Sequence, residues 1–465
     1  MFIIEKNTST PFIRQIYDQI RIQILGGQLP EGDKLPSTRE MAAHLGVSRN
    51  VVIEAYDLLL AEGYLVSRHG AGTFVTHGIT LDWKPQHPPE IAKDKNSNQS
   101  ISISVDFRSG IPELNTIPQK RLARLAYQAW LDSPHSTFSY GAPQGELELR
   151  VSIANYLMKT RGTLCNPENI IITSGSVQGL SLISQLLMEK NFKNTIIIED
   201  PSNKDIRKIF TLPENQIIPV PVDQEGLMTE FLPKQTPVNA IQVTPSHQYP
   251  LGGILPIRRR LELIRYAQNA DAFIIEDDYD SEFRYEGPPV SPLQSLAPDR
   301  VIYLGTFSKI LFPSLRLGYM ILPENLLEIA KNIKRLSDIH SNSQNQLILA
   351  EFIRDGGLER HISRVKKIYR KRRDKLIECL NREFSNQVEI WGQSTGLHLV
   401  AAFKKIKFET ELLSKIIASG VKVYPVDEHA FKTGDQLNKL IFGYGHLPED
   451  VIEDGVKKLA LIIRQ

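Results

Sequence analysis

Residues 36–75, PSTREMAAHLGVSRNVVIEAYDLLLAEGYLVSRHGAGTFV, decide the fold of the N-terminal part of the chain. Ser37 followed three residues later by Glu40 is typical of a capping box that opens a helix. Gly46 is a helix-ending residue, and Ser48 can cap the next helix, which is expected to run to about residue 62. Two short helices joined by a tight turn with glycine predict a helix-turn-helix.

Flanking segments complete a small domain. Apolar residues at helical spacing predict a further helix over 12–25. The stretch LVSRHGAGTFV (65–75) alternates apolar and polar residues around a glycine-rich tip, which predicts a two-stranded wing. Six residues of the predicted helices are expected to form the core: Met41, Leu45, Val51, Val52, Tyr56 and Leu59.

The pattern PS-x-R, LG-VSR, AY, EG and GTFV closely resembles the winged helix of the GntR family, over about 65 residues. The resemblance implies that this domain contacts DNA, and it implies a set of DNA-binding residues in the two helices and the wing tip: Arg39, Ser48, Arg49, Asn50, Arg68, His69 and Gly70. The start of the recognition helix faces base edges in such motifs. Residues 1–78 hold seven Lys or Arg against eight Asp or Glu, so we expect modest non-specific DNA affinity.

A proline-containing, polar stretch then interrupts the apolar periodicity. We expect a winged-helix domain over 1–78, a flexible linker over 79–104 and a large domain over 105–465. The 465 residues carry a net charge of +2 and are 41% hydrophobic, which favours a soluble protein rather than a disordered or membrane-embedded one. The sequence shows no secretory signal, and only two cysteines, too few for a disulfide framework or a zinc site; we therefore expect a cytoplasmic protein without a metal.

Short β-branched strands alternate with amphipathic helices in the large domain. This pattern predicts an α/β fold with a mainly parallel sheet, whose ligands bind beyond the carboxyl ends of the strands. The strand candidates are residues 169–175, 194–200, 239–245, 271–277 and 300–309, and the helices between them include 177–189 and 257–268.

Three motifs at predicted strand ends indicate one chemistry. In GTFSKILFPSLRLGY (305–319), Lys309 stands among hydroxyl residues and Arg316 could pair with a phosphate. In IIEDDYDSEFRY (274–285), a carboxylate could keep a pyridine nitrogen protonated. TSGSVQGL (173–180) offers small residues at a helix N-terminus, which favours an anion.

In this order the motifs resemble fold-type I aminotransferases, over about residues 105–465. The resemblance implies pyridoxal 5'-phosphate as the cofactor, Lys309 as its Schiff-base partner, Asp277 at the pyridine nitrogen and Tyr279 at the phenolic oxygen. It also implies a phosphate cup and two residues near the ring. The cup comprises Ser174, Gly175, Ser176, Thr306 and Arg316; Ser308 is a further cofactor-binding residue, and Tyr249 and Asn203 occupy the ring positions.

A GntR-type winged helix joined to such a domain resembles the MocR/GabR family of bacterial transcriptional regulators. The segment YGAPQGELELR (140–150) matches a family segment that lines the partner subunit's pocket. The resemblance implies a homodimer that binds operator DNA and senses a small amine, an amino acid or the cofactor itself. A working aminotransferase with an attached DNA-binding domain, and a DNA-binding protein whose large domain is only a scaffold, stay open as alternatives.

Two positions differ from the family pattern. Asn203 stands where a tyrosine usually stacks on the cofactor ring, and Lys439 is the nearest cation to the place of the usual carboxylate-binding arginine. The sequence therefore disfavours transamination of an α-amino acid. A run of eight basic residues in twelve, RVKKIYRKRRDK (364–375), is interpreted as a solvated helix face, with a DNA-backbone patch as the alternative.

Overall fold

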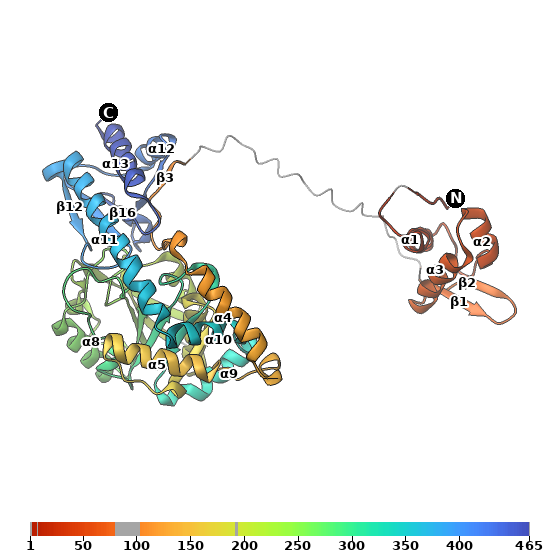
Figure 1. The fold of residues 1–465 in the computed structure, drawn as a ribbon, viewed down its shortest axis with the longest axis horizontal. Helices are drawn as coiled ribbons and strands as arrows, with labels where there is room; N and C mark the ends of the chain where they lie inside the picture. The colour runs from red at the N-terminus through yellow and green to blue at the C-terminus, as the bar shows by residue number, and fades with distance from the viewer. Residues whose placement is uncertain (1, 7, 80–102, 191–193, 465) are drawn as a thin grey trace. The chain divides into compact units, whose positions relative to one another are not determined.

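The computed structural model describes residues 2–6, 8–79, 103–190 and 194–464. The chain divides into two compact units, residues 1–100 and 101–465, shown in Figure 1. Most of the predicted linker lies outside the described residues. Of its two ends, Ile79 packs on the core of the first unit, and the Ser104 amide donates to Gly420 O of the second at 2.8 Å.

The N-terminal unit is a three-helix domain with a wing, as the sequence predicts. Its elements are α1 (Phe12–Leu25), α2 (Thr38–Leu45), α3 (Arg49–Ala61), β1 (Leu65–Arg68) and β2 (Gly72–Val75), the two strands pairing antiparallel. The Ser37–Glu40 capping box forms in both directions. Of the six predicted core residues, four are buried and two are partly buried, the latter being Leu45 and Val51.

The C-terminal unit is built on an eight-stranded sheet in the order β4-β11-β10-β9-β8-β5-β6-β7. Its strands are β4 (Ile170–Thr173), β5 (Asn194–Asp200), β6 (Asn215–Asp223), β7 (Gly226–Leu227), β8 (Ala240–Val243), β9 (Phe273–Asp278), β10 (Val301–Thr306) and β11 (Gly318–Ile321). The five strands from β10 to β6 run parallel, while β11 and β7 pair antiparallel. The α/β fold with a mainly parallel sheet is confirmed.

Helices pack on this sheet and extend beyond it. They are α4 (Gln119–Asp132), α5 (Leu147–Arg161), α6 (Ser176–Lys190), α7 (Lys204–Phe210), α8 (Ile257–Asn269), α9 (Leu327–Asp338) and α10 (Ser343–Arg354). The 28-residue helix α11 (Gly357–Phe384) runs from α10 toward the C-terminal helix α13 (Glu449–Ile463), as Figure 1 shows. Of the described helices, none is long and apolar enough to cross a membrane.

A smaller antiparallel sheet forms a second layer near the C-terminus. Its order is β12-β13-β16-β15, from β12 (Val388–Trp391), β13 (His398–Phe403), β16 (Lys439–Gly443) and β15 (Tyr424–Pro425). The short strand β3 (Val105–Asp106) pairs with β14 (Val421–Lys422), and α12 (Thr410–Ala418) precedes β14. This pairing brings the start of the unit next to its end.

Helix α6 lies very close to strand β10. A Cβ atom added at Gly179 would lie 2.4 Å from Cδ2 of Leu304, so no side chain fits between the helix and the sheet. The Gly179 amide donates to Gly175 O at 3.2 Å, one turn nearer the start of the helix. Gly179 therefore sets how closely the N-terminus of α6 approaches the sheet.

Candidate functional site

The predicted DNA-binding residues of α2 and α3 lie on one open surface. Arg39, Ser48, Arg49 and Asn50 are all exposed. The Arg49 Nε atom donates to Oγ1 of Thr38 at 3.3 Å. Ser48 occupies the N-cap position of α3 with extended backbone, but its side chain makes no capping hydrogen bond. The predicted N-cap position of Ser48 is confirmed, although its hydroxyl does not cap the helix and is exposed.

The wing tip presents the other predicted DNA contacts. All three residues are exposed: Arg68 ends β1, while His69 and Gly70 lie in the turn that follows, where Gly70 adopts a left-handed φ of +73°. The Arg68 guanidinium lies 4.9 Å from the centroid of the Phe74 ring. Stacking on Phe74 restricts the directions in which Arg68 can extend.

The predicted cofactor residues come together at the carboxyl edge of the parallel sheet. Each follows a strand: Ser174, Gly175 and Ser176 follow β4, Asn203 follows β5, Tyr249 follows β8, Asp277 and Tyr279 lie at the end of β9, and Thr306, Ser308 and Lys309 lie at the end of β10. Arg316 precedes β11, which is antiparallel to β10 and so starts at the same edge. The topology thus gathers motifs that are far apart in sequence.

Lys309 is a partly buried amine directed at the backbone near the start of the unit. Its Nζ atom donates to Gly110 O at 2.8 Å. Burial lowers the pKa of Lys309 below its usual value, and the nearby charge of Asp280 opposes this effect. A lowered pKa increases the neutral, nucleophilic fraction of the amine. Ser308 is buried beside it, with its amide donating to Oγ1 of Thr306 at 3.2 Å.

The adjacent carboxylates Asp277 and Asp278 have different surroundings. Asp278 is satisfied, because its Oδ2 atom pairs with Arg161 at 2.9 Å and accepts from the Tyr303 hydroxyl at 2.8 Å. The Oδ1 atom of Asp277 is buried without a hydrogen-bond partner among the described residues. Burial, followed by the charges of Asp278 and Asp280, raises the pKa of Asp277 to about 7. A buried, unpartnered carboxylate oxygen fits a ligand that brings its own donor, such as a protonated pyridine nitrogen.

Tyr279 is held by a histidine that the sequence reading did not single out. The Tyr279 hydroxyl donates to His247 O at 2.8 Å, and Nδ1 of His247 lies 2.9 Å from Oδ2 of Asp280. His398 stacks beside it with ring centroids 4.5 Å apart. Ligand atoms of His247, Asp280 and His398 lie within 4.8 Å of one another, so this trio has the donor types of a metal site. The only sequence signals for it were the motifs SHQ and EDDYD.

A glycine and an arginine lie together at one corner of the candidate site. Gly175 has φ +102°, and a Cβ atom added there would lie 3.2 Å from Nη2 of Arg316. Arg316 itself adopts a left-handed φ of 52°. Ser176 is the first residue of α6, and Ser174 N donates to Gln178 Oε1 at 2.7 Å. A guanidinium beside a helix N-terminus is well suited to a phosphate.

Tyr249 closes the pocket from the end of β8. Its hydroxyl lies 3.1 Å from Oγ of Ser109, and its ring packs edge-to-face against His398 and His429 at 5.2 and 5.1 Å. Burial raises the pKa of Tyr249. The ring of Tyr279 lies 6.3 Å away. Tyr249 therefore links the sheet edge to the segment that contains Ser109.

The two positions that differ from the family pattern have other contacts. Asn203 caps α7, with its Oδ1 atom accepting from the Asp205 amide at 2.9 Å. Lys439 lies 4.6 Å above the Trp391 ring and donates to Oε1 of Gln436 at 2.5 Å. The side chains of Asn203 and Lys439 therefore both interact with neighbouring residues of this chain.

The basic run in α11 is only partly a solvated face. Arg372 and Arg373 are buried: Arg372 pairs with Glu113 and Gly445 O, and Arg373 donates to Gln393 O at 2.8 Å. The solvated-face interpretation is wrong for these two residues because they join α11 to neighbouring loops. The members that do face solvent are Arg364, Lys367, Arg370 and Lys371.

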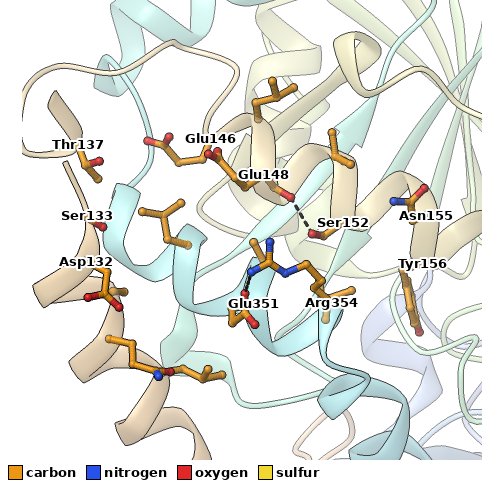
Figure 2. A pocket seen from close by; sticks show the side chains of 18 of the residues that line it. Asp132, Ser133, Thr137, Glu146, Glu148, Ser152, Asn155, Tyr156, Glu351 and Arg354 are labelled. Carbon is orange, nitrogen blue, oxygen red and sulfur yellow. Dashed lines mark hydrogen bonds and ion pairs between the residues drawn. The ribbon is translucent and has the colours of Figure 1, made fainter.

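A separate hollow of about 930 Å³ lies between α4, α5 and α10, as Figure 2 shows. Its lining includes Asp132, Glu146, Glu148 and Glu351, and among the described residues none of the predicted cofactor-binding residues lines it. Large apolar side chains are exposed on the same elements and the loops beside them: Tyr127, Trp130, Leu131, Phe138, Tyr140 and Leu147. An exposed apolar surface of this kind is typical of an interface.

Comparison with known families agrees with this two-part architecture. Residues 12–75 match the family described as bacterial regulatory proteins, gntR family, and residues 102–435 match aminotransferase class I and II. Among solved structures, a multiple substrate aminotransferase from Thermococcus profundus is 27% identical with a TM-score of 0.71, over 78% of this chain and 92% of that chain. The Pyrococcus horikoshii kynurenine aminotransferase is 28% identical with a TM-score of 0.72, over 79% and 92%. Fold and site therefore define a helix-turn-helix protein with an aminotransferase-like domain.

Full-length relatives define the family more closely. The chain is 37% identical to the uncharacterized HTH-type transcriptional regulator YdeL of Bacillus subtilis, over 98% of this chain and 97% of the relative. It is 36% identical to the pyridoxine biosynthesis regulator PdxR of Corynebacterium glutamicum (96% and 94%), and 32% to the probable rhizopine catabolism regulatory protein MocR of Rhizobium meliloti (99% and 95%). The chain belongs to the MocR family of GntR-type transcriptional regulators.

Proposed function

We propose that this regulator binds pyridoxal 5'-phosphate in its aminotransferase-like domain and uses it to sense a small amine, an amino acid or the cofactor itself. The observation that carries the proposal is the pair of Lys309, an amine with lowered pKa, and Asp277, a buried carboxylate with an unpartnered oxygen, at one sheet edge. The relative named as a pyridoxine biosynthesis regulator supports the cofactor itself as one possible signal.

Different residues of the site would hold different parts of the cofactor. The bound group would supply an aldehyde and an electron-withdrawing aromatic ring. Lys309 would hold the aldehyde carbon covalently, and Asp277 would accept a hydrogen bond from the protonated ring nitrogen. Tyr279 would redirect its hydroxyl proton from His247 O to the phenolic oxygen. The phosphate would lie against Ser174, Gly175, Ser176, Thr306, Ser308 and Arg316, while Tyr249 and Asn203 flank the ring.

DNA recognition is assigned to the open surface of the N-terminal unit. Arg39, Ser48, Arg49 and Asn50 would face the major groove, with the wing residues Arg68, His69 and Gly70 beside it. The exposure of all seven residues is consistent with this role, since each is accessible without rearrangement.

A homodimer is proposed from the exposed apolar surface of the C-terminal unit. Tyr140 is 81% exposed and lies in the segment 140–150, where the family contacts a partner subunit. Trp130 and Phe138 stack on each other at 5.7 Å and are 60% and 47% exposed. A second copy would bury these rings, which favours association in water.

The absorption spectrum of the purified chain tests the cofactor proposal. We expect a visible band from cofactor joined to a lysine in the natural protein and its loss in Lys309→Ala, with operator binding measured in parallel. A natural protein that has no such band after incubation with pyridoxal 5'-phosphate would overturn the proposal and favour a scaffold role for the large domain.

The second candidate is a working aminotransferase, which the gathered Lys309, Asp277, Tyr279 and Arg316 favour. Turnover distinguishes an aminotransferase from a sensor, because an aminotransferase should convert an amino donor and a 2-oxo acid many times per active site. A single conversion per site, or none, supports the sensor function.

A further inference from the structure

A short segment at the start of the C-terminal unit, residues 105–111, contacts Lys309 and Tyr249 at the edge of the proposed cofactor site. We call this edge the mouth and the segment the mouth segment. The Phe107 amide donates to Lys422 O at 3.0 Å, and Phe107 O accepts from the Gly443 amide at 2.8 Å. Further along, Ser109 contacts the Tyr249 hydroxyl and Gly110 O accepts from Nζ of Lys309. The backbone is thus fixed on both sides of Arg108, next to the proposed cofactor-binding lysine.

Arg108 is a positively charged residue at this mouth. Its side chain is exposed, and among the described residues the guanidinium has no hydrogen-bond or ion-pair partner. Its positive charge helps to lower the pKa of Lys309, after the larger effect of burial, and it opposes the burial-driven rise in the pKa of Tyr249 and of Tyr424. Three groups that surround the mouth therefore lie within the electrostatic reach of Arg108.

Two other charged groups near the mouth already have partners. Asp106 accepts from the Tyr424 hydroxyl at 2.8 Å and from the Arg108 backbone amide at 3.0 Å. Lys204 pairs with Glu428 at 3.3 Å. The charge of Arg316 also acts on Lys309, but Arg316 is assigned to the phosphate, which leaves Arg108 to pair with an incoming carboxylate.

The strand that often carries a carboxylate-binding arginine in aminotransferases is apolar here. Ile441 of β16 is buried in a cluster with Leu251, Val400 and Val426, against which Tyr249 packs. Lys439, two residues earlier, is engaged by Trp391 and Gln436. Of the described residues that make up this cluster, none is a cation that could bind an acidic group on a ligand.

We propose that the effector is a small amine that also carries a carboxylate, and that Arg108 binds this carboxylate while the amine reaches the cofactor at Lys309. This proposal rests on the proposed function and names the chemical class of its ligand. Arg108 is then the residue that distinguishes amino acids from plain amines. Its place on the mouth segment, rather than on β16, lets the binding of an acid act on the backbone that Lys309 also contacts.

The test compares probes that differ only in the acid. The cofactor-loaded full chain is titrated with β-alanine and with propylamine, and binding is followed in the absorption spectrum. Glycine and L-alanine then serve as shorter acids, and ethylamine serves as a further plain amine. We expect the natural protein to bind at least one acid-bearing probe more tightly than both plain amines. In Arg108→Gln this preference should fall by about tenfold, the size expected for a charge-assisted hydrogen bond in a solvent-accessible site. Affinity for the plain amines should change by less than about threefold.

Two further variants separate a specific contact from a general change in charge. Lys204→Gln removes one positive charge from the same mouth and should keep the preference. Arg108→Lys should restore part of it, because a point charge replaces a bidentate partner. Equal affinity for acid-bearing and plain amines in the natural protein, or an unchanged preference in Arg108→Gln, would overturn the proposal. Absence of the cofactor band in the natural protein would instead count against the proposed function, since Arg108→Gln itself should retain that band.

Discussion

The proposed DNA-binding surface and the proposed cofactor site hold their residues in opposite ways. Around the recognition helix, Ser48, Arg49 and Asn50 are exposed, and Arg49 has one weak side-chain contact at 3.3 Å. In the pocket, Asp277 is buried with its pKa raised to about 7. A residue on an open surface can change with little effect on the fold, whereas a buried ionisable group affects stability as well as binding. The two regions should therefore respond differently to substitution.

The largest effect is expected for Lys309→Ala. The covalent attachment of cofactor should be lost completely, because this side chain supplies the amine, while the chain stays folded and associated. The visible spectrum and the size-exclusion profile measure the two outcomes. A variant that is recovered only as aggregate would contradict the view that Lys309 serves the ligand rather than the fold.

Asp277→Asn should act on stability and on cofactor binding in opposite directions. In cofactor-free protein the raised pKa means that the stability from the neutral carboxyl is fully present below about pH 4, and is lost as the pH rises through about 7. Asparagine does not titrate, so the variant should gain up to about 4 kcal/mol over the natural protein above pH 7.

The measurement is thermal unfolding of both cofactor-free proteins across this pH range, followed by cofactor titration. The stability difference should shrink toward pH 4, and the variant should bind cofactor more weakly. A difference that does not vary with pH would contradict the buried, raised-pKa state of Asp277.

Arg49→Ala should weaken operator binding by roughly ten- to a hundredfold, the value of one good base contact. The cofactor spectrum should be unaffected, because Arg49 belongs to the other unit. Binding to operator and to random DNA is measured side by side. Equal losses on both would mean that Arg49 contacts phosphate instead of a base.

The smallest effect is expected for the wing and for the exposed part of α11. Arg68→Gln should lower the slope of log affinity against log salt by about one, as expected for one lost phosphate contact. The matched change of Arg364, Lys367 and Lys371 to Gln should leave the slope unaltered. A decrease of about one per residue in this triple variant would extend the DNA-binding surface to the aminotransferase-like unit.

The sequence was most informative where function depends on local pattern. The Ser37–Glu40 box and the bounds of α1 follow from spacing within one helix, and the cofactor motifs follow from strand ends. The sequence could not indicate which carboxylate of Asp277 and Asp278 is free, since the answer depends on Arg161 and Tyr303 in distant elements.

Two further features were hidden for the same reason. The basic residues of α11 were interpreted as a solvated face, yet Arg372 is buried against Glu113, which lies 259 residues away in sequence. The His247–Asp280 pair likewise joins two motifs that are separate in the chain. Long-range pairing of charged residues leaves no periodic signal.

The close approach of α6 to β10 at Gly179 has a genetic consequence. A single methyl group there would press on Leu304 and push away the helix whose first turn holds the proposed phosphate site. In a screen for alleles that no longer respond to the signal, changes at Gly179 should recur beside changes at Lys309, although no atom of Gly179 need touch the ligand.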